Sequence, residues 1–171
     1  MTIEQLINYQ AGRLGAVPGI LAVFTKGNAG PVYNGQIFDG NSSDAVLLHE
    51  YLTGLSILIT SGEHEWAVSL AKDLVPSAFT DDDIPSFPDN KGGAFYQSTE
   101  RFGHIHMRTP SFNVLAHESY HALGWVSDQM GMPKTEQTEE FFCYYEQFIV
   151  RSYETVVNDY DRNNLIVKLF S

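Results

Sequence analysis

The chain has 171 residues, 43% of them hydrophobic and 13% aromatic, which suits one folded domain and excludes an intrinsically disordered chain. Ten Lys and Arg against 21 Asp and Glu give a net charge of −11, which argues against binding to nucleic acid or an anionic membrane, because like charges repel. The one cysteine, Cys143, excludes an internal disulfide and favours a reducing compartment such as the cytoplasm. We expect neither a signal peptide nor a membrane span.

The N-terminal half predicts helices around a pair of strands. A helix is expected over residues 3–14, where apolar residues recur at helical spacing. Two short strands, 20–25 and 32–38, flank a turn that contains two glycines and a proline. The apolar stretch that follows predicts a core helix over 44–59, and a second helix is expected over 63–74.

The C-terminal half predicts an exposed acidic loop, a strand pair and two long helices. In chain order these elements cover residues 77–93, 94–97, 102–107, 109–130 and 136–157. A short strand or docked tail is expected over 165–170. The order of elements predicts the α+β class, with a single domain over 1–171 and a small antiparallel or mixed sheet. Within that domain, we expect residues 1–93 to complete the fold and residues 94–157 to carry the site.

The segment His117-Glu118-Ser119-Tyr120-His121 carries the most specific chemical signal in the sequence. Residues four apart lie on the same face of a helix, so His117 and His121 can direct two imidazoles at one zinc ion. Glu118 lies about 100° round the helix from His117, where it can act as a general base on a water in the open position of the metal. The alternative interpretation is a pair of ordinary, hydrogen-bonded helix histidines.

A catalytic zinc needs a third protein ligand, and three downstream acids compete for that position. Asp128 lies on the correct face but about 10 Å farther along the same helix. Glu139 and Glu140 begin the next helix, which the turn at Gly131 is expected to fold back against the first. We prefer Glu140, with Glu139 second, because Glu140 lies opposite an apolar stripe. The stripe consists of Phe142, Tyr145, Ile149, Tyr153 and Val156.

The motif His-Glu-x-x-His, followed by a glutamate on the next helix, resembles the zincin metallopeptidases and, among them, the gluzincin arrangement. The longer pattern over residues 95–157 is similar to small metallopeptidase-like proteins of tailed phages. This resemblance implies a zinc site formed by His117, His121 and Glu140. The metzincin variant, with a third histidine or an aspartate six residues after the second, is a minority interpretation because Ser127 occupies that position.

The resemblance also implies roles for one strand and one tyrosine. In zincins an edge strand beside the helix pairs with an extended peptide, and we expect the strand over 102–107 to take this place. His104 and His106 share one face of that strand, which we expect to be solvated or to line the cleft. Tyr144, one turn after Glu140, is either a catalytic donor to the oxyanion or a core residue.

Three other groups of reactive side chains receive structural interpretations. Cys143 lies within an aromatic helix and is expected to be a small buried residue rather than a nucleophile. His49 with Glu50, and His64 with its flanking glutamates, have no partner at ligand spacing. We expect both groups at the surface.

The sequence therefore predicts a zinc-dependent peptidase with Zn²⁺ as its cofactor and a peptide or protein as its substrate. It is expected in the cytoplasm, that of the bacterial host if a phage encodes it. Glu118 is the predicted catalytic base, and the net charge of −11 favours basic or neutral peptides. The alternative is a zinc-binding interaction or phage assembly protein in which hydrolysis is weak or lost.

Overall fold

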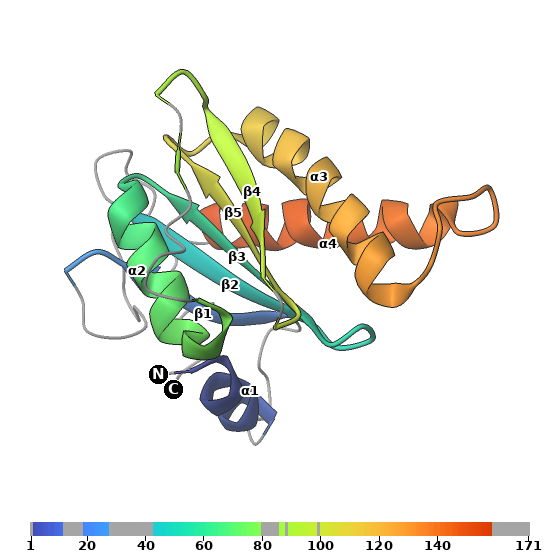
Figure 1. Cartoon of the computed structure of the whole chain (residues 1–171), viewed down its shortest axis with the longest axis horizontal. Helices are drawn as coiled ribbons and strands as arrows, with labels where there is room; N and C mark the ends of the chain where they lie inside the picture. Colours follow the sequence, from blue (N-terminus) through green and yellow to red (C-terminus); the bar gives the residue numbers. More distant parts are fainter. Residues whose placement is uncertain are drawn as a thin grey trace.

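A five-stranded mixed sheet forms the centre of the protein (Figure 1). The computed structural model describes residues 2–11, 19–27, 43–79, 86–87, 89–98 and 100–158. The strands are β1 (Ile20–Thr25), β2 (Asp44–Glu50), β3 (Leu55–Ser61), β4 (Gly93–Gln97) and β5 (Phe102–Met107), in the spatial order β1-β2-β3-β5-β4. β3 and β5 are parallel, and the other neighbours pair antiparallel. The sheet therefore joins both halves of the chain and ends at β4.

Helices cover both faces of the sheet (Figure 1). They are α1 (Ile3–Ala11), α2 (His64–Leu74), the short 3-10 helix η1 (Pro76–Ala78), α3 (Phe112–Met130) and α4 (Glu139–Asn158). Side chains alternate between the two faces of a strand. Accordingly, β3 contributes Ile57 and Ile59 to the core under α3 and α4, and Leu58 to the core under α1 and α2.

Residues 44–59 belong to an antiparallel hairpin, so the predicted core helix is wrong. β2 and β3 pair along their whole length, and every residue of both strands is buried. A strand that is buried on both faces has no polar alternation, and its continuous apolar run is not distinguishable from a buried helix by periodicity. The local signal for the hairpin is Gly54, whose positive φ of 69° suits the turn.

The α+β class and most other predicted elements are confirmed. The elements predicted over 20–25, 63–74, 94–97, 102–107, 109–130 and 136–157 are present, with ends that differ by a few residues. α3 ends at Gly131, whose φ of 59° is the left-handed conformation expected of a helix-terminating glycine. The predicted strand over 32–38 and the tail over 165–170 lie outside the described residues. In the described parts, no helix combines the length and apolar character that crossing a bilayer requires.

Candidate metal centre

Helix α3 carries the two histidines of the predicted site on the side that faces away from the core. Its first turn is capped by Ser111, whose side chain accepts a hydrogen bond from the backbone N–H of Val114 at 3.3 Å. One side of the helix packs into the core, through Leu115, Ala122, Leu123, Trp125 and Val126. This packing fixes the rotation of the helix and leaves His117 and His121 exposed.

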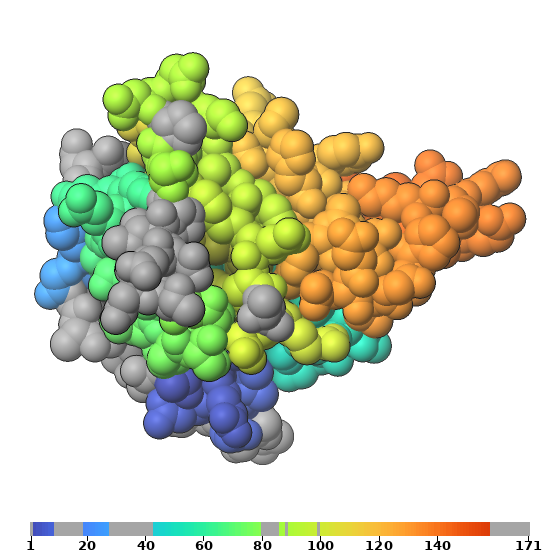
Figure 2. All heavy atoms as spheres, in the orientation of Figure 1, coloured from blue at the N-terminus to red at the C-terminus, as the bar shows by residue number. Residues whose placement is uncertain are grey.

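A cleft of about 1020 Å³ lies between α3 and β4, which run side by side on one face of the molecule (Figure 2). His117, Glu118 and His121 line it together, as do all five residues of β4. The strand beside the motif helix is therefore β4, because β4 is at the edge of the sheet and β5 lies between β3 and β4. The expectation that residues 102–107 form the edge strand is wrong.

The two exposed histidines lie at a distance that is compatible with a shared metal ion. Their ring centroids are 5.1 Å apart and the ring planes are inclined at 70°. A zinc–nitrogen bond of about 2.1 Å puts each ring centroid roughly 3.2 Å from the ion, so two rings at a tetrahedral angle have centroids about 5.2 Å apart. The spacing of His117 and His121 therefore fits two of the ligands of a zinc ion.

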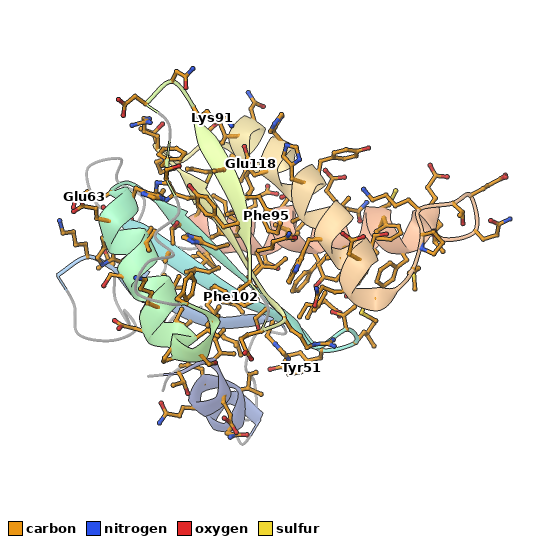
Figure 3. The ribbon with its side chains drawn as sticks, in the orientation of Figure 1. Tyr51, Glu63, Lys91, Phe95, Phe102 and Glu118 are labelled. Carbon is orange, nitrogen blue, oxygen red and sulfur yellow. The ribbon has the colours of Figure 1, made fainter. Side chains whose placement is uncertain are left out.

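Glu118 is buried, unlike the histidines that flank it. Its side chain is 7% exposed and lies where α3 passes β4 (Figure 3). A Cβ atom built on Gly93 would be 3.1 Å from Cγ of Glu118, so the absence of a side chain at Gly93 provides the space for this carboxylate. Burial, and then the nearby Glu118 carboxylate, raise the pKa of Tyr96 on β4. The predicted base thus lies at the narrow part of the cleft, next to the edge strand.

The outer side of β4 presents backbone groups to the cleft. The N–H of Ser98 donates to the carbonyl of Phe102 at 2.9 Å, and the N–H of Arg108 donates to the carbonyl of Gly92 at 2.8 Å. Bonded residues alternate along an antiparallel pair, so the alternate residues of β4 direct N–H and C=O groups away from β5. These residues are Gly93, Phe95 and Gln97. The strand can therefore pair with an extended peptide.

The structure does not bring the predicted third ligand next to the histidines. Glu140 is exposed on the first turn of α4, and no described residue of α4 lines the cleft. Glu139 lines a separate groove between α3 and α4, and Asp128 is exposed near the end of α3. Within the described ranges, no three His, Cys, Asp or Glu side chains are grouped closely enough to hold a metal ion.

Tyr144 lies apart from the motif residues. Its side chain is 46% exposed and lines a smaller pocket with Ile20 of β1 and Phe148 of α4. The apolar stripe predicted on α4 is confirmed, because all five of its residues are buried. Tyr144 is not in that stripe, which explains its exposure.

His104 and His106 are buried, so the expectation of a solvated or cleft-lining face is wrong. Both point to the α2 side of the sheet, opposite the α3 cleft, where β5 is covered by its neighbours. The hydroxyl of Thr60 lies 2.7 Å from Nε2 of His104 and 2.9 Å from Nδ1 of His106. The ring of His64 on α2 is 5.2 Å from that of His106, and its Nε2 is 3.2 Å from the hydroxyl of Tyr96.

Two further surface or core assignments are corrected. Cys143 is exposed, because it faces the groove between α3 and α4 instead of the sheet. His49 and Glu50 are buried, since they lie on the interior strand β2 and not on a helix. His49 Nδ1 is 2.8 Å from the hydroxyl of Ser56, and the Glu50 carboxylate accepts bonds from the backbone and hydroxyl of Thr53.

The contribution of β4 and its glycines to the cleft was not predicted from the sequence. The available signal was the pair Gly92-Gly93 at the start of a short strand, since glycine in a strand marks close approach of another element. Comparison with known protein families, curated proteins and solved structures finds no match for this chain. The function of the chain is therefore inferred from the geometry of its cleft.

Proposed function

We propose that the protein is a zinc-dependent peptidase. The observation that supports this proposal is that His117, Glu118 and His121 line one cleft together with β4, whose outer edge pairs with no strand of the described residues. Two imidazoles at the spacing of a shared ion, a carboxylate beside them and a strand edge that can receive a peptide are the components that the reaction needs. The lone cysteine suits the cytoplasm as the proposed place of action.

In the proposed site His117 and His121 would hold the metal, and Glu140 remains the predicted third ligand, with Glu139 as the alternative. Zinc, when bound, acidifies a coordinated water and polarises a carbonyl group. The Glu118 carboxylate accepts a proton from the attacking water and delivers it to the nitrogen of the leaving amine. The oxyanion role of Tyr144 remains a prediction, because its side chain lines a different pocket.

The proposed substrate is an extended peptide that pairs with β4. Strand pairing supplies main-chain hydrogen bonds that do not depend on the peptide sequence. The net charge of −11 attracts basic peptides and disfavours acidic ones. We therefore propose basic or neutral peptides as the preferred substrates.

The direct test compares the wild type with Glu118→Gln and Glu154→Gln on a fluorogenic peptide library in the presence of zinc. Glu118→Gln keeps the size of the side chain but removes the base, so we expect a loss of cleavage of about 10²-fold or more. Glu154 is exposed on α4 and lines none of the cleft, so Glu154→Gln is the matched control and keeps wild-type cleavage.

Metal analysis completes this test. We expect one zinc per chain, and a melting temperature that rises with added zinc and loses this response in His117→Ala. Between Glu140→Gln and Glu139→Gln, the variant that weakens zinc binding more identifies the third ligand. A chain that binds zinc but cleaves no peptide would instead support the zinc-binding interaction or assembly protein, and a chain that binds no zinc would contradict both functions.

A further inference from the structure

The cleft between β4 and α3 widens along the strand. At Gly93 the helix is so close that an added Cβ would lie 2.4 Å from Cγ1 of Val114. Two residues on, the same face of β4 carries Phe95, whose ring centroid is 5.8 Å from that of Trp125 on α3. The strand and the helix are therefore farther apart at Phe95 than at Gly93, and the rings of Phe95 and Trp125 pack between them.

Gly124 lines this cleft, and neither a close contact nor a positive φ explains a glycine there. The residue is inside the continuous helix α3, three positions after His121, and it lines the cleft next to Trp125. A Cβ added at Gly124 would meet nothing within 4 Å, and its φ is not positive. Glycine in a helix interior lowers stability relative to alanine.

Gly93, Gly103 and Gly131 each have a reason in the fold, whereas a Cβ added at Gly92, which also lines the cleft, would make only an ordinary contact with Val114. Gly93 and Gly103 have no room for a side chain, since a Cβ at Gly103 would lie 2.9 Å from the ring of Phe95. Gly131 has the positive φ of a helix end. At Gly124 the missing side chain instead enlarges an open space that two aromatic rings border.

We propose that Gly124, Phe95 and Trp125 form a subsite for one large apolar side chain of the peptide, and that Gly124 keeps this subsite open. The proposal rests on the proposed function, because it takes the cleft as the place where a peptide binds. A peptide paired with β4 places alternate side chains on the α3 face of the sheet. The one that meets the wide part of the cleft is buried against the aromatic rings, which favours Phe or Leu over Ala.

Binding measurements with uncleaved peptides test the subsite separately from catalysis. The probes are two fluorescein-labelled decapeptides of Gly and Ser, one with a single central Phe and one with a single central Ala. With zinc-loaded Glu118→Gln protein, fluorescence anisotropy is expected to give about tenfold tighter binding of the Phe peptide. Adding Gly124→Leu to that protein fills the subsite, so we expect this ratio to fall to near one.

Two further variants keep the result interpretable. Ala116→Leu adds a side chain of the same kind at an exposed α3 position outside the cleft, and it should preserve the tenfold ratio. Gly124→Ala should raise the melting temperature and reduce the preference for Phe in the same protein. A gain in melting temperature together with a loss of the preference for Phe is not expected from a glycine with a purely structural role.

Each outcome bears on one proposal. An unchanged Phe preference in Gly124→Leu, or equal binding of both peptides by the protein without that change, would overturn the subsite. Cleavage that depends on Glu118 but shows no preference for Phe would support the proposed peptidase function. The same result would overturn the subsite. A retained, Gly124-dependent Phe preference without any cleavage supports the subsite and contradicts the peptidase. No binding of either peptide overturns the subsite as well.

Discussion

Thr60 joins two buried histidines on the side of the sheet that faces away from the cleft. A hydroxyl group has a single hydrogen, so at least one of the two imidazoles donates its own N–H to Oγ1. One nitrogen of His104 and one of His106 are thus hydrogen-bonded while both rings can stay neutral. Both rings are buried, and burial disfavours the charged form of an imidazole.

We expect the free energy of unfolding to fall as the pH decreases from about 6.5 toward about 4. Burial, and then the neighbouring histidines, lower the pKa of His104 to about 3. Burial, followed by His64 and Arg108, lowers that of His106 to about 4. The unfolded chain takes up these protons at a higher pH than the folded chain, so this contribution is complete above about 6.5 and is lost on acidification. Denaturant titrations across this range measure the loss.

The double variant His104→Gln/His106→Gln isolates the contribution of the two rings. Its unfolding free energy should depend less steeply on pH than that of the wild type, by about one proton, or about 1.4 kcal/mol per pH unit, for each histidine. Each single variant should remove about half of the difference. A wild-type slope in the double variant would instead assign the pH dependence to carboxylates.

At the residue scale, the sequence predicted which side chains lie on the same side of a helix, but it did not predict which side chains are buried. The four-residue spacing of His117 and His121 is sufficient to put them on one side of a helix, and both line the cleft with Glu118. The burial of His104 and the exposure of Cys143 were not predicted. Both depend on which element covers the side chain, and no local pattern specifies that.

The contact between α3 and β4 is closest at Gly93. Val114, Glu118 and the carbonyl of His106 all lie within 3.1 Å of the place that a Cβ atom would occupy. Native side chains at such contacts have no space to move without shifting the helix, because protein interiors are closely packed. The distance between the motif helix and the edge strand is therefore set by this glycine.

We expect Gly93→Ala to destabilise the protein by about 1–3 kcal/mol, the usual cost of an overpacked site. Gly124→Ala is the matched control, and it should stabilise the protein by up to about 1 kcal/mol, because its added methyl group meets open space in a helix. The second change Val114→Ala removes the closest clash and should restore part of the loss. Chemical denaturation measures all three, and a Gly93→Ala protein as stable as the wild type would contradict the close contact.

At the element scale, the helices with capping signals were predicted better than the strands. Ser111 and Gly131 bound α3 in the structure as their residue types indicate. The hairpin over residues 44–61 was mistaken for a helix because both of its strands are buried on both faces. The choice of β5 as the edge strand failed because the order of strands depends on pairing across distant segments.

Over the whole molecule, the position of the cleft follows from the strand order. β5 pairs in parallel with β3 and leaves β4 as the last of the described strands, directly beside α3. The order of the predicted elements indicated the α+β class, the composition indicated a buried core, and the motif indicated where on the chain the candidate site lies. The third metal ligand was predicted from helix faces alone, and the structure places Glu140 away from the cleft, because the direction in which α4 leaves the turn is a tertiary property.

The net charge of −11 and the open strand edge predict how the protein responds to salt. Unpaired strand edges are templates for pairing with another copy, and mutual repulsion opposes this at low ionic strength. Salt shortens the screening length to about 3 Å at 1 M, so we expect dimers at high salt and monomers at low salt in sedimentation experiments. Gln97→Pro removes an outward N–H group without breaking the ladder to β5 and should keep the protein monomeric. A wild type that stays monomeric at 1 M salt would contradict this expectation.

The outer edge of β4, which pairs with no described strand, has a consequence for how the protein is handled. A peptide and a second copy of the chain would compete for the same backbone groups of Gly93, Phe95 and Gln97, so each displaces the other by mass action. A bound peptide then acts as a solubilising agent. Conversely, apparent peptide affinity should decline as the protein concentration rises, and inhibition assays are best interpreted at high dilution.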